Sequence, residues 1–411
     1  MDIERVEFTE DMKKEYTILV PNMLPIHFKL IIAILKNYGY NIELLETQGQ
    51  HIAQTGIKHV HNDTCYPAIL VIGQLIDAIE NGGYDKDKIA LMITQTGGGC
   101  RASNYIHLLR KALLNAGYGN IPVISLNFSG TEKSPGFKLS PKIIQQLVYS
   151  VILGDLIMTL YNQCRPYEEE VGSCDEAVSS ILSTIADHFK GRTIIKYKEI
   201  KLLAKNIVDK FNTVKSKAEQ KVRVGIVGEI YVKFSPLGNN ELENFLISEN
   251  AEPVLPGLMD FCLYTIYNSV MDYKLYGRKA IKAVTSSFIY KYIIQKQNDI
   301  REIVRSSSNF HVPHNFEEGR QRASQVISLG VKMGEGWLLP AEIIGLVSHG
   351  VNNVICTQPF GCLPNHIAGK GMIRKIRELY PSANIVPVDY DPGASKVNQE
   401  NRIKLMLADA K

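Results

Sequence analysis

The chain has 411 residues, 45% hydrophobic and 21% charged, the composition of a globular protein long enough for two or three domains. Its net charge of +4 is small for this length and its basic residues are spread out, so we expect no nucleic-acid partner. No uncharged apolar run reaches the ~18 residues of a membrane-spanning helix, and we expect no membrane segment. Seven cysteines and an acidic start without a signal-peptide pattern predict a cytoplasmic protein that has no disulfide framework.

The first part of the chain alternates predicted strands with predicted helices. The strands are expected at residues 16–20, 41–45, 88–94 and 120–127, and the helices at 24–38, 68–79 and 105–116. Alternating elements joined by short loops indicate right-handed βαβ units on a parallel sheet. We therefore predict a doubly wound α/β domain over residues 1–137.

A helical segment follows. Apolar residues recur at amphipathic spacing from Ile143 to Leu156, the stretch Arg165–Glu168 interrupts the pattern, and helices resume at 174–189 and 200–211. We interpret residues 138–219 as a helical insertion.

Residues 220–411 are predicted to form a second α/β domain. Its expected strands are 221–228, an extended segment near 253–255, 351–355 and 384–389. Its expected helices are 239–248, a helical segment at about 258–308, 319–333, 340–349, 367–380 and a last helix after Ser395. The predicted fold class is thus α/β, with two Rossmann- or flavodoxin-like parallel-sheet domains and helical insertions. Ligands of open α/β sheets bind at the carboxyl ends of the strands, so we expect a shared site between the two domains.

Four cysteines lie in loops next to predicted helix starts. Cys100 follows a predicted strand and three glycines at positions 97–99, and Cys65 lies just before Pro67 and the helix at 68–79. Cys356 and Cys362 bracket a predicted loop before the helix at 367–380. Free N–H groups and the positive end of the helix dipole favour a thiolate at such positions.

Three interpretations of these four cysteines compete. They could be unrelated buried thiols; they could bind zinc, although the close cysteine pairs usual in structural zinc sites are missing; or they could hold an iron–sulfur cluster, whose thiolate ligands can come from distant segments. We predict a cluster, most simply 4Fe–4S, held by Cys65, Cys100, Cys356 and Cys362 between the two α/β domains.

Other residues are secondary candidates. Cys262 is predicted to be a core residue, and Cys164 and Cys174 are either buried or further ligands of a larger cluster. Glu229 at the end of a predicted strand and His366 near Cys362 are candidates for moving protons. Ser103 and Asn104 beside Cys100 could donate hydrogen bonds to cluster sulfurs.

Several motifs together resemble the 2-hydroxyacyl-CoA dehydratase superfamily, in particular the C-terminal part of large acyl-CoA dehydratase activase-type proteins. The motifs are Asn-Asp-Thr-Cys-Tyr-Pro-Ala at 62–68, Gln-Thr-Gly-Gly-Gly-Cys-Arg-Ala-Ser-Asn-Tyr at 95–105, Arg-Pro-Tyr-Glu at 165–168, Val-Gly-Glu-Ile-Tyr-Val at 227–232, and Cys-Thr-Gln-Pro-Phe-Gly-Cys-Leu-Pro-Asn-His at 356–366. They span nearly the whole chain.

The resemblance implies an iron–sulfur cluster between two α/β domains and a separate ATP-hydrolysing activase that delivers a low-potential electron. It also implies two alternatives. One is a lyase that dehydrates a 2-hydroxyacyl-CoA through an open cluster iron, with Glu229 or His366 moving protons. The other is a double-cubane cluster protein that reduces small molecules. Expected partners are therefore the activase or another electron donor and an acyl-CoA or small-molecule substrate, and the chain could form a homodimer.

The number of motif cysteines distinguishes these functions. In the dehydratases, three cysteines per cluster leave one iron open for substrate, whereas four motif cysteines are present here. That count favours an iron–sulfur redox protein that accepts electrons from the activase.

Overall fold

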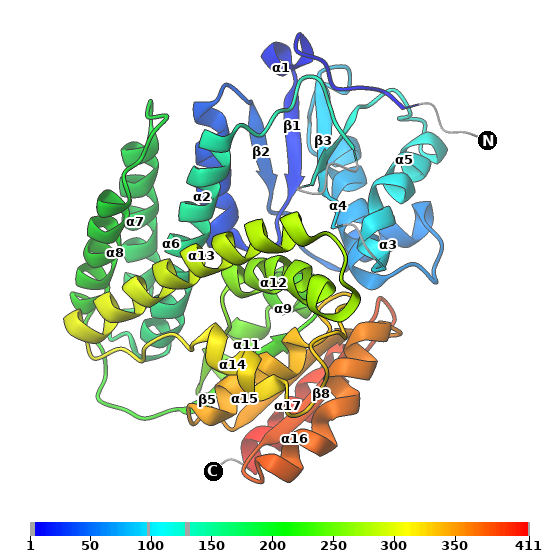
Figure 1. Ribbon diagram of the computed structural model, residues 1–411. Helices are drawn as coiled ribbons and strands as arrows, with labels where there is room; N and C mark the ends of the chain where they lie inside the picture. Colours follow the sequence, from blue (N-terminus) through cyan, green and yellow to red (C-terminus); the bar gives the residue numbers. More distant parts are fainter. Residues whose placement is uncertain (1–4, 97–98, 128–131, 410–411) are drawn as a thin grey trace.

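Two four-stranded parallel β-sheets, one in each half of the chain, organise the fold (Figure 1). The computed structural model describes residues 5–96, 99–127 and 132–409. The strands are β1 (Thr17–Pro21), β2 (Ile42–Leu45), β3 (Ile89–Thr94), β4 (Val123–Leu126), β5 (Val222–Gly228), β6 (Ala251–Val254), β7 (Asn353–Pro359) and β8 (Asn384–Tyr390). They are ordered β2-β1-β3-β4 and β6-β5-β7-β8, with parallel pairing throughout. The predicted α/β class with two parallel sheets is confirmed.

The first sheet is buried because its central strands are apolar on both faces. Ile18, Leu19 and Val20 of β1 are all buried, as expected of a parallel strand covered on both sides. The helices of this unit are α1 (Met12–Glu15), α2 (Pro25–Asn37), α3 (Gln50–His59), α4 (Tyr66–Asn81), the short 3-10 helix Arg101–Asn104 and α5 (Tyr105–Asn115). Helices α2, α4 and α5 lie within about two residues of their predicted positions, whereas α3 was not predicted.

Three long helices follow the first sheet and lie to one side of it in Figure 1. They are α6 (Pro141–Cys164), which continues into a 3-10 turn (Arg165–Tyr167), α7 (Ser173–Phe189) and α8 (Tyr197–Asn212). Ser140 begins α6 by accepting a hydrogen bond from the Ile143 N–H, with Pro141 in the first turn. Among the described residues, this helix alone is long and apolar enough to cross a membrane, but 67% of its apolar window is buried inside the protein.

The second sheet carries the remaining helices. They are α9 (Ile230–Phe234), α10 (Pro236–Asn239), α11 (Leu242–Ser248), α12 (Leu258–Tyr276), α13 (Ala280–Ser307), α14 (Phe316–Ala323), α15 (Leu338–Ser348), a π-helical turn (Asn365–Gly369), a 3-10 turn (Lys370–Met372), α16 (Ile373–Leu379) and α17 (Lys396–Ala408). Helix α13 crosses the middle of the molecule in Figure 1.

Three predicted elements of this second unit are wrong in extent. The helix expected at 319–333 begins at Phe316 and ends at Ala323. The stretch after it contains Gly330, which disfavours a helix. The helix expected at 367–380 is divided into the π-helical turn, the 3-10 turn and α16.

The third difference concerns β7, which continues through residues predicted to be a loop. Residues 356–359 pair with β8, and Thr357 and Gln358 are fully buried. The Thr357 hydroxyl donates to the Val227 carbonyl at 3.0 Å and Gln358 Nε2 donates to Asp389 at 2.6 Å, whereas Gln358 Oε1 has no hydrogen-bond partner among the described residues. An apolar pattern cannot detect a buried strand end of this kind.

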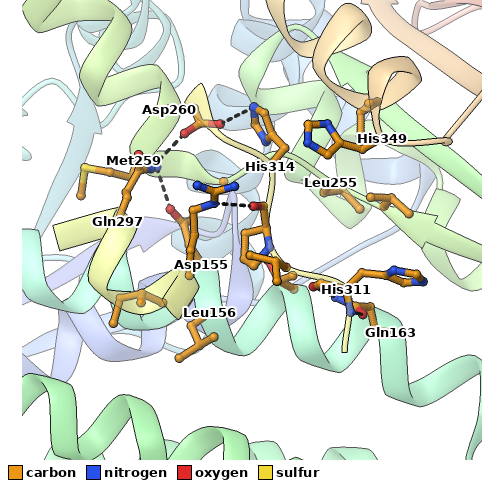
Figure 2. Close-up of a pocket in the computed structure, with 18 of the residues that line it drawn as sticks. Asp155, Leu156, Gln163, Leu255, Met259, Asp260, Gln297, His311, His314 and His349 are labelled. Carbon is orange, nitrogen blue, oxygen red and sulfur yellow. Dashed lines mark hydrogen bonds and ion pairs between the residues drawn. The ribbon is translucent and has the colours of Figure 1, made fainter. Parts of the chain in front are cut away.

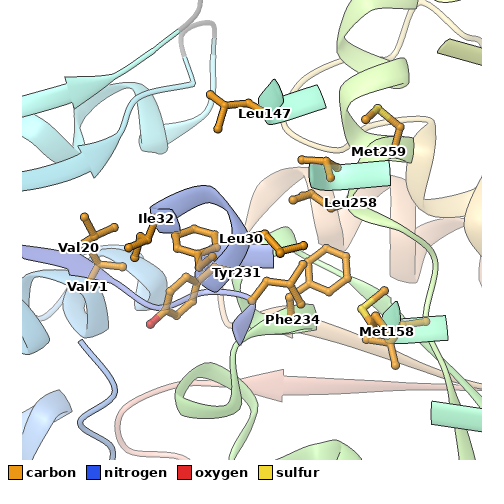
Figure 3. Packing of buried hydrophobic residues seen from close by; sticks show 14 of the residues in the cluster. Val20, Leu30, Ile32, Val71, Leu147, Met158, Tyr231, Phe234, Leu258 and Met259 are labelled. Carbon is orange, nitrogen blue, oxygen red and sulfur yellow. The ribbon is translucent and has the colours of Figure 1, made fainter. Parts of the chain in front are cut away.

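A continuous hydrophobic core joins the two halves. Residues from both sheets and from α6 belong to one buried cluster. Figure 3 shows Tyr231 and Phe234 of α9, in the second unit, among Leu30 of α2, Val71 of α4 and Met158 of α6. The two units are therefore packed directly against each other.

Helices α3 and α4 cross at very close range through two glycines, and this crossing fixes the loop that carries Cys65. A Cβ atom at Gly73 would lie 2.1 Å from the Ile52 carbonyl oxygen, and one at Gly56 would lie 2.1 Å from the Ile69 carbonyl oxygen. Only glycine allows the two backbones to approach this closely.

We expect Gly73→Ala to lower the free energy of unfolding by about 1–3 kcal/mol, because the added methyl group forces the two helices apart. Urea denaturation measures the change. Gly119→Ala is a matched control: its added Cβ would meet the flexible end of Leu114 at 3.1 Å, and we expect a change within about 0.5 kcal/mol. Equal stability of the Gly73→Ala variant and the native protein would contradict the close crossing.

Candidate functional site

Three of the four predicted cysteine ligands gather where the two halves of the chain meet. Cys65 directly precedes α4, Cys100 follows β3 and precedes the 3-10 helix Arg101–Asn104, and Cys362 follows β7. All three are partly exposed. Burial, with smaller contributions from Glu229 and from the nearby thiols of Cys362 and Cys100, raises the pKa of the Cys65 thiol to about 12. We call these residues the three-cysteine site.

Cys356 is not brought to this site. It lies within β7, is fully buried, and belongs to a small separate core with Val227, Ile343 and Ile376. Its sulfur is 3.3 Å from the position of a Cβ at Gly369. Burial raises its pKa to about 12, and the charges that add to this effect are those of Glu342, Asp389 and Glu335. Its side chain is fixed in the core because β7 extends through residue 356 and does not end before it, as predicted.

Two buried side chains donate hydrogen bonds to sulfur atoms of the site. The Tyr105 hydroxyl donates to Cys65 Sγ at 3.2 Å, and Asn365 Nδ2 donates to Cys362 Sγ at 3.4 Å. Ser103, predicted as such a donor, instead donates to the backbone carbonyl of Cys100 at 2.7 Å. Donors aimed at sulfur stabilise negative charge there, as a thiolate ligand requires.

Two carboxyl groups lie beside the cysteines. Glu229, a predicted candidate, begins α9 and accepts a hydrogen bond from the Val232 N–H at 2.8 Å. Its burial, together with the neighbouring charge of Glu335, raises its pKa to about 8. Glu335 is buried and accepts hydrogen bonds from the Ile230 N–H at 3.1 Å and from Asn365 Nδ2 at 3.2 Å. Burial raises the pKa of Glu335 as well.

Glu335 was not predicted. It lies between α14 and α15, on a loop that contacts the residues around Cys100. Met333, two residues earlier, covers Gly99, where a Cβ would lie only 1.8 Å from the Met333 Cε. Arg101 Nη1 also donates to the Asp63 carbonyl at 2.9 Å, which joins the loops of Cys100 and Cys65. The other two glycines of the predicted turn, at positions 97 and 98, lie outside the described residues. The sequence feature that could have indicated Glu335 as a candidate is its position between two glycines, Gly334 and Gly336.

A buried ion pair lies close to Glu229 and Glu335. Lys233 Nζ is 2.7 Å from Glu342 Oε1, and both side chains are almost fully buried. Lys233 also lowers the pKa values of Glu229 and Glu335, opposing the effect of burial. It is thus a nearby cation that acts on two buried carboxyl groups, those of Glu335 and Glu342, and on the partly buried Glu229.

Of the remaining candidates, His366 contacts the backbone of a site cysteine, whereas the other cysteines lie elsewhere. His366 is half-exposed, with Nδ1 2.9 Å from the Cys362 carbonyl oxygen and Nε2 3.5 Å from Asp389. Cys164 and Cys174 are buried next to each other, and a hydrogen bond between their sulfurs lowers the pKa of Cys164. Cys262 lies on α12, where burial raises its pKa to about 12.

The described side chains do not form a ready-made site for a single metal ion. Among the described residues, no three cysteine, histidine, aspartate or glutamate side chains converge as ligands of one ion. Zinc requires ligand sulfurs about 2.3 Å from a single centre. The thiolates of a 4Fe–4S cluster each bind a different iron, so they lie further apart than the ligands of a single metal ion. No protein-family model matches the chain, and no curated protein matches its sequence.

Proposed function

We propose that this chain is an iron–sulfur redox protein of the 2-hydroxyacyl-CoA dehydratase type, with Cys65, Cys100 and Cys362 as the thiolate ligands of a 4Fe–4S cluster. The observation that carries the proposal is the meeting of these three cysteines from both halves of the chain, with Tyr105 and Asn365 donating hydrogen bonds to two of the sulfurs. When bound, such a cluster stores and transfers one electron at a time. Three thiolates leave one of its irons without a cysteine ligand.

The surface around the site supports a protein partner as the source of electrons. Large apolar side chains near Cys362 and Cys100 are more than half exposed: Phe360, Leu363, Ile367 and Met333. Exposed apolar side chains gathered at one place are typical of protein-interaction surfaces. We propose that a separate ATP-hydrolysing activase, or another low-potential donor, docks here.

A second candidate function is a lyase that dehydrates a 2-hydroxyacyl-CoA. The specific observation in its favour is the cysteine count, because exclusion of Cys356 leaves three ligands and removes the departure from the dehydratase pattern. Loss of a hydroxyl group as water also requires a proton. Glu229 holds a proton at neutral pH because its pKa is about 8, and it lies beside the cysteines.

A spectroscopic titration with acyl-CoA distinguishes the two functions. The reduced, anaerobically reconstituted protein is mixed with 2-hydroxyacyl-CoA, and the electron paramagnetic resonance spectrum is recorded before and after. An unchanged spectrum supports the electron-transfer protein. A changed spectrum with formation of the unsaturated acyl-CoA, lost in Glu229→Gln at unchanged iron content, supports the lyase. Protein that incorporates no iron and sulfide contradicts both.

The hydrogen bond from Tyr105 gives a prediction about the reduction potential. We expect Tyr105→Phe to retain its iron but to have a lower potential, because a donor to a ligand sulfur stabilises the more negative, reduced state. A spectroelectrochemical titration measures the shift. Tyr84→Phe, which removes a hydroxyl bound to Glu43 at the surface, is expected to leave the potential unchanged. An equal potential in Tyr105→Phe and the native protein would count against this role of the hydrogen bond.

A further inference from the structure

A cavity of about 100 Å³ lies between α6, α12, α13, α15 and the second sheet (Figure 2). Its lining is mainly apolar, with side chains such as Leu156, Leu255 and Leu346, and it is large enough for several waters or a small organic molecule. No residue of the three-cysteine site lines it. Arg223, near the start of β5, lines the cavity, whereas Glu229 follows the end of that strand, about 20 Å further along at ~3.3 Å per residue.

The two carboxylates of the cavity already have partners. Asp155 accepts hydrogen bonds from the N–H groups of Leu258 and Met259 at 2.7 and 2.9 Å and lies 2.8 Å from His27 Nε2. Asp260 accepts a hydrogen bond from Gln297 at 3.0 Å and lies 3.3 Å from His314 Nε2, an arrangement visible in Figure 2. The carboxyl oxygens of these acids are therefore directed at groups other than Arg301, and burial raises the pKa of Asp260 to about 8, so that Asp260 is mostly protonated near pH 7.

Arg301 is a cation of this cavity that lacks a directly paired carboxylate among the described residues. Its Nε donates to the Pro313 carbonyl at 2.9 Å, but within the described ranges no carboxylate lies within 4 Å of its guanidinium. Arg223, in contrast, is paired with Glu252 at 3.2 Å. Burial lowers the pKa of Arg301, and the negative charge of Glu318, which is not paired directly with the guanidinium, partly opposes this effect. A partly buried, unpaired guanidinium beside a cavity is a ready partner for an anion.

The loop opposite Arg301 is held in place. The backbone of His311 makes two hydrogen bonds with the side chain of Gln163, at 2.7 and 3.0 Å, and Pro313 accepts the bond from Arg301. Burial lowers the pKa of His314 to about 3 and that of His311 below its usual value, so both rings are neutral near pH 7. Within the part of the chain that the structure describes, Arg301 is then the cation of the lining that has no directly paired carboxylate, and a bound monoanion would supply one.

We propose that this cavity binds a small aliphatic monocarboxylate, with its carboxylate on the Arg301 guanidinium and its hydrocarbon part against Leu156, Leu255 and Leu346. The planar guanidinium is suited to a carboxylate because it donates two parallel hydrogen bonds. The apolar lining favours a short alkyl chain over a fully hydrated inorganic anion. This site is independent of the iron–sulfur proposal, since it shares no residue with the three-cysteine site.

Isothermal titration calorimetry of the full chain tests the site, with acetate, butyrate, hexanoate and inorganic phosphate compared at constant ionic strength. We expect saturable binding of a carboxylate, tighter than that of phosphate, and a loss of about tenfold or more in affinity in Arg301→Gln. Arg305→Gln is the matched control, because Arg305 lies one turn further along α13, is exposed and pairs with Glu302. It should bind as the native protein does.

Arg301→Lys is a second variant for the case in which Arg301→Gln does not fold. It keeps the positive charge but cannot donate two parallel hydrogen bonds to a carboxylate. We expect its affinity for the carboxylate to be about tenfold lower than that of the native protein. Absence of saturable carboxylate binding by the native protein would overturn the proposal. Unchanged affinity in the folded Arg301 variants, or tighter binding of phosphate than of any carboxylate, would also overturn it.

Discussion

Serine substitution of Cys65, Cys100 or Cys362 is expected to remove most of the iron and sulfide from the anaerobically reconstituted protein, whereas Cys356→Ser is expected to keep it. Each of the first three changes removes a proposed thiolate ligand. The loss in affinity should therefore exceed the ~10- to 100-fold that follows from removing only a hydrogen-bond partner of a ligand. Iron and acid-labile sulfide, measured per folded chain, give the result.

Two matched controls distinguish ligand loss from general damage. Cys356→Ser places a hydroxyl in a buried apolar core and should cost about 1–3 kcal/mol of stability without loss of iron. Cys262→Ser on α12 should likewise retain its iron. If Cys356→Ser lost its iron while Cys100→Ser retained it, the assignment of three ligands would be wrong.

The second large effect concerns the buried pair of Lys233 and Glu342. We expect Lys233→Met to lower the free energy of unfolding by about 3–5 kcal/mol, because Glu342 is left buried without its cation. The other oxygen of Glu342 already has no hydrogen-bond partner, so the carboxyl group has little compensation. Chemical denaturation of the single variant measures the loss.

The double variant Lys233→Met with Glu342→Leu is the control for this prediction. It replaces both charges by apolar groups, an exchange that is often neutral or stabilising when a buried ion pair is removed completely. We expect it to recover most of the lost stability. A double variant as unstable as Lys233→Met alone would show that the unpaired charge is not the cause.

The fold could be predicted largely from local patterns. The apolar runs at β1 and β3 and the helical spacing in α5 and α6 mark their elements within a few residues, because buried parallel strands and amphipathic helices have distinct periods. The extent of β7 could not be predicted in this way. Thr357 and Gln358 are polar, and only their tertiary hydrogen bonds make them suitable for the interior of a sheet.

The site was predicted in part for a related reason. Cys65 and Cys100 could be predicted as site residues from local helix-start patterns, and Cys362 could be predicted from its position in the loop after a strand. Cys356 was grouped with them because the end of β7 was placed too early. Tyr105 contacts Cys65, and Glu335 contacts Asn365, from positions distant in the sequence, and no local pattern indicates such long-range partners. Asn365 is only three residues from Cys362, to whose sulfur it donates.

Mössbauer spectroscopy of the native protein, reconstituted anaerobically with enriched iron and accompanied by an iron and sulfide count, tests the central claim most directly. The three-cysteine site predicts about four irons and four sulfides per chain, with one iron spectroscopically distinct because it has no cysteine ligand. Irons that are all equivalent would contradict the three-ligand site. Stoichiometric zinc without sulfide would contradict an iron–sulfur cluster altogether.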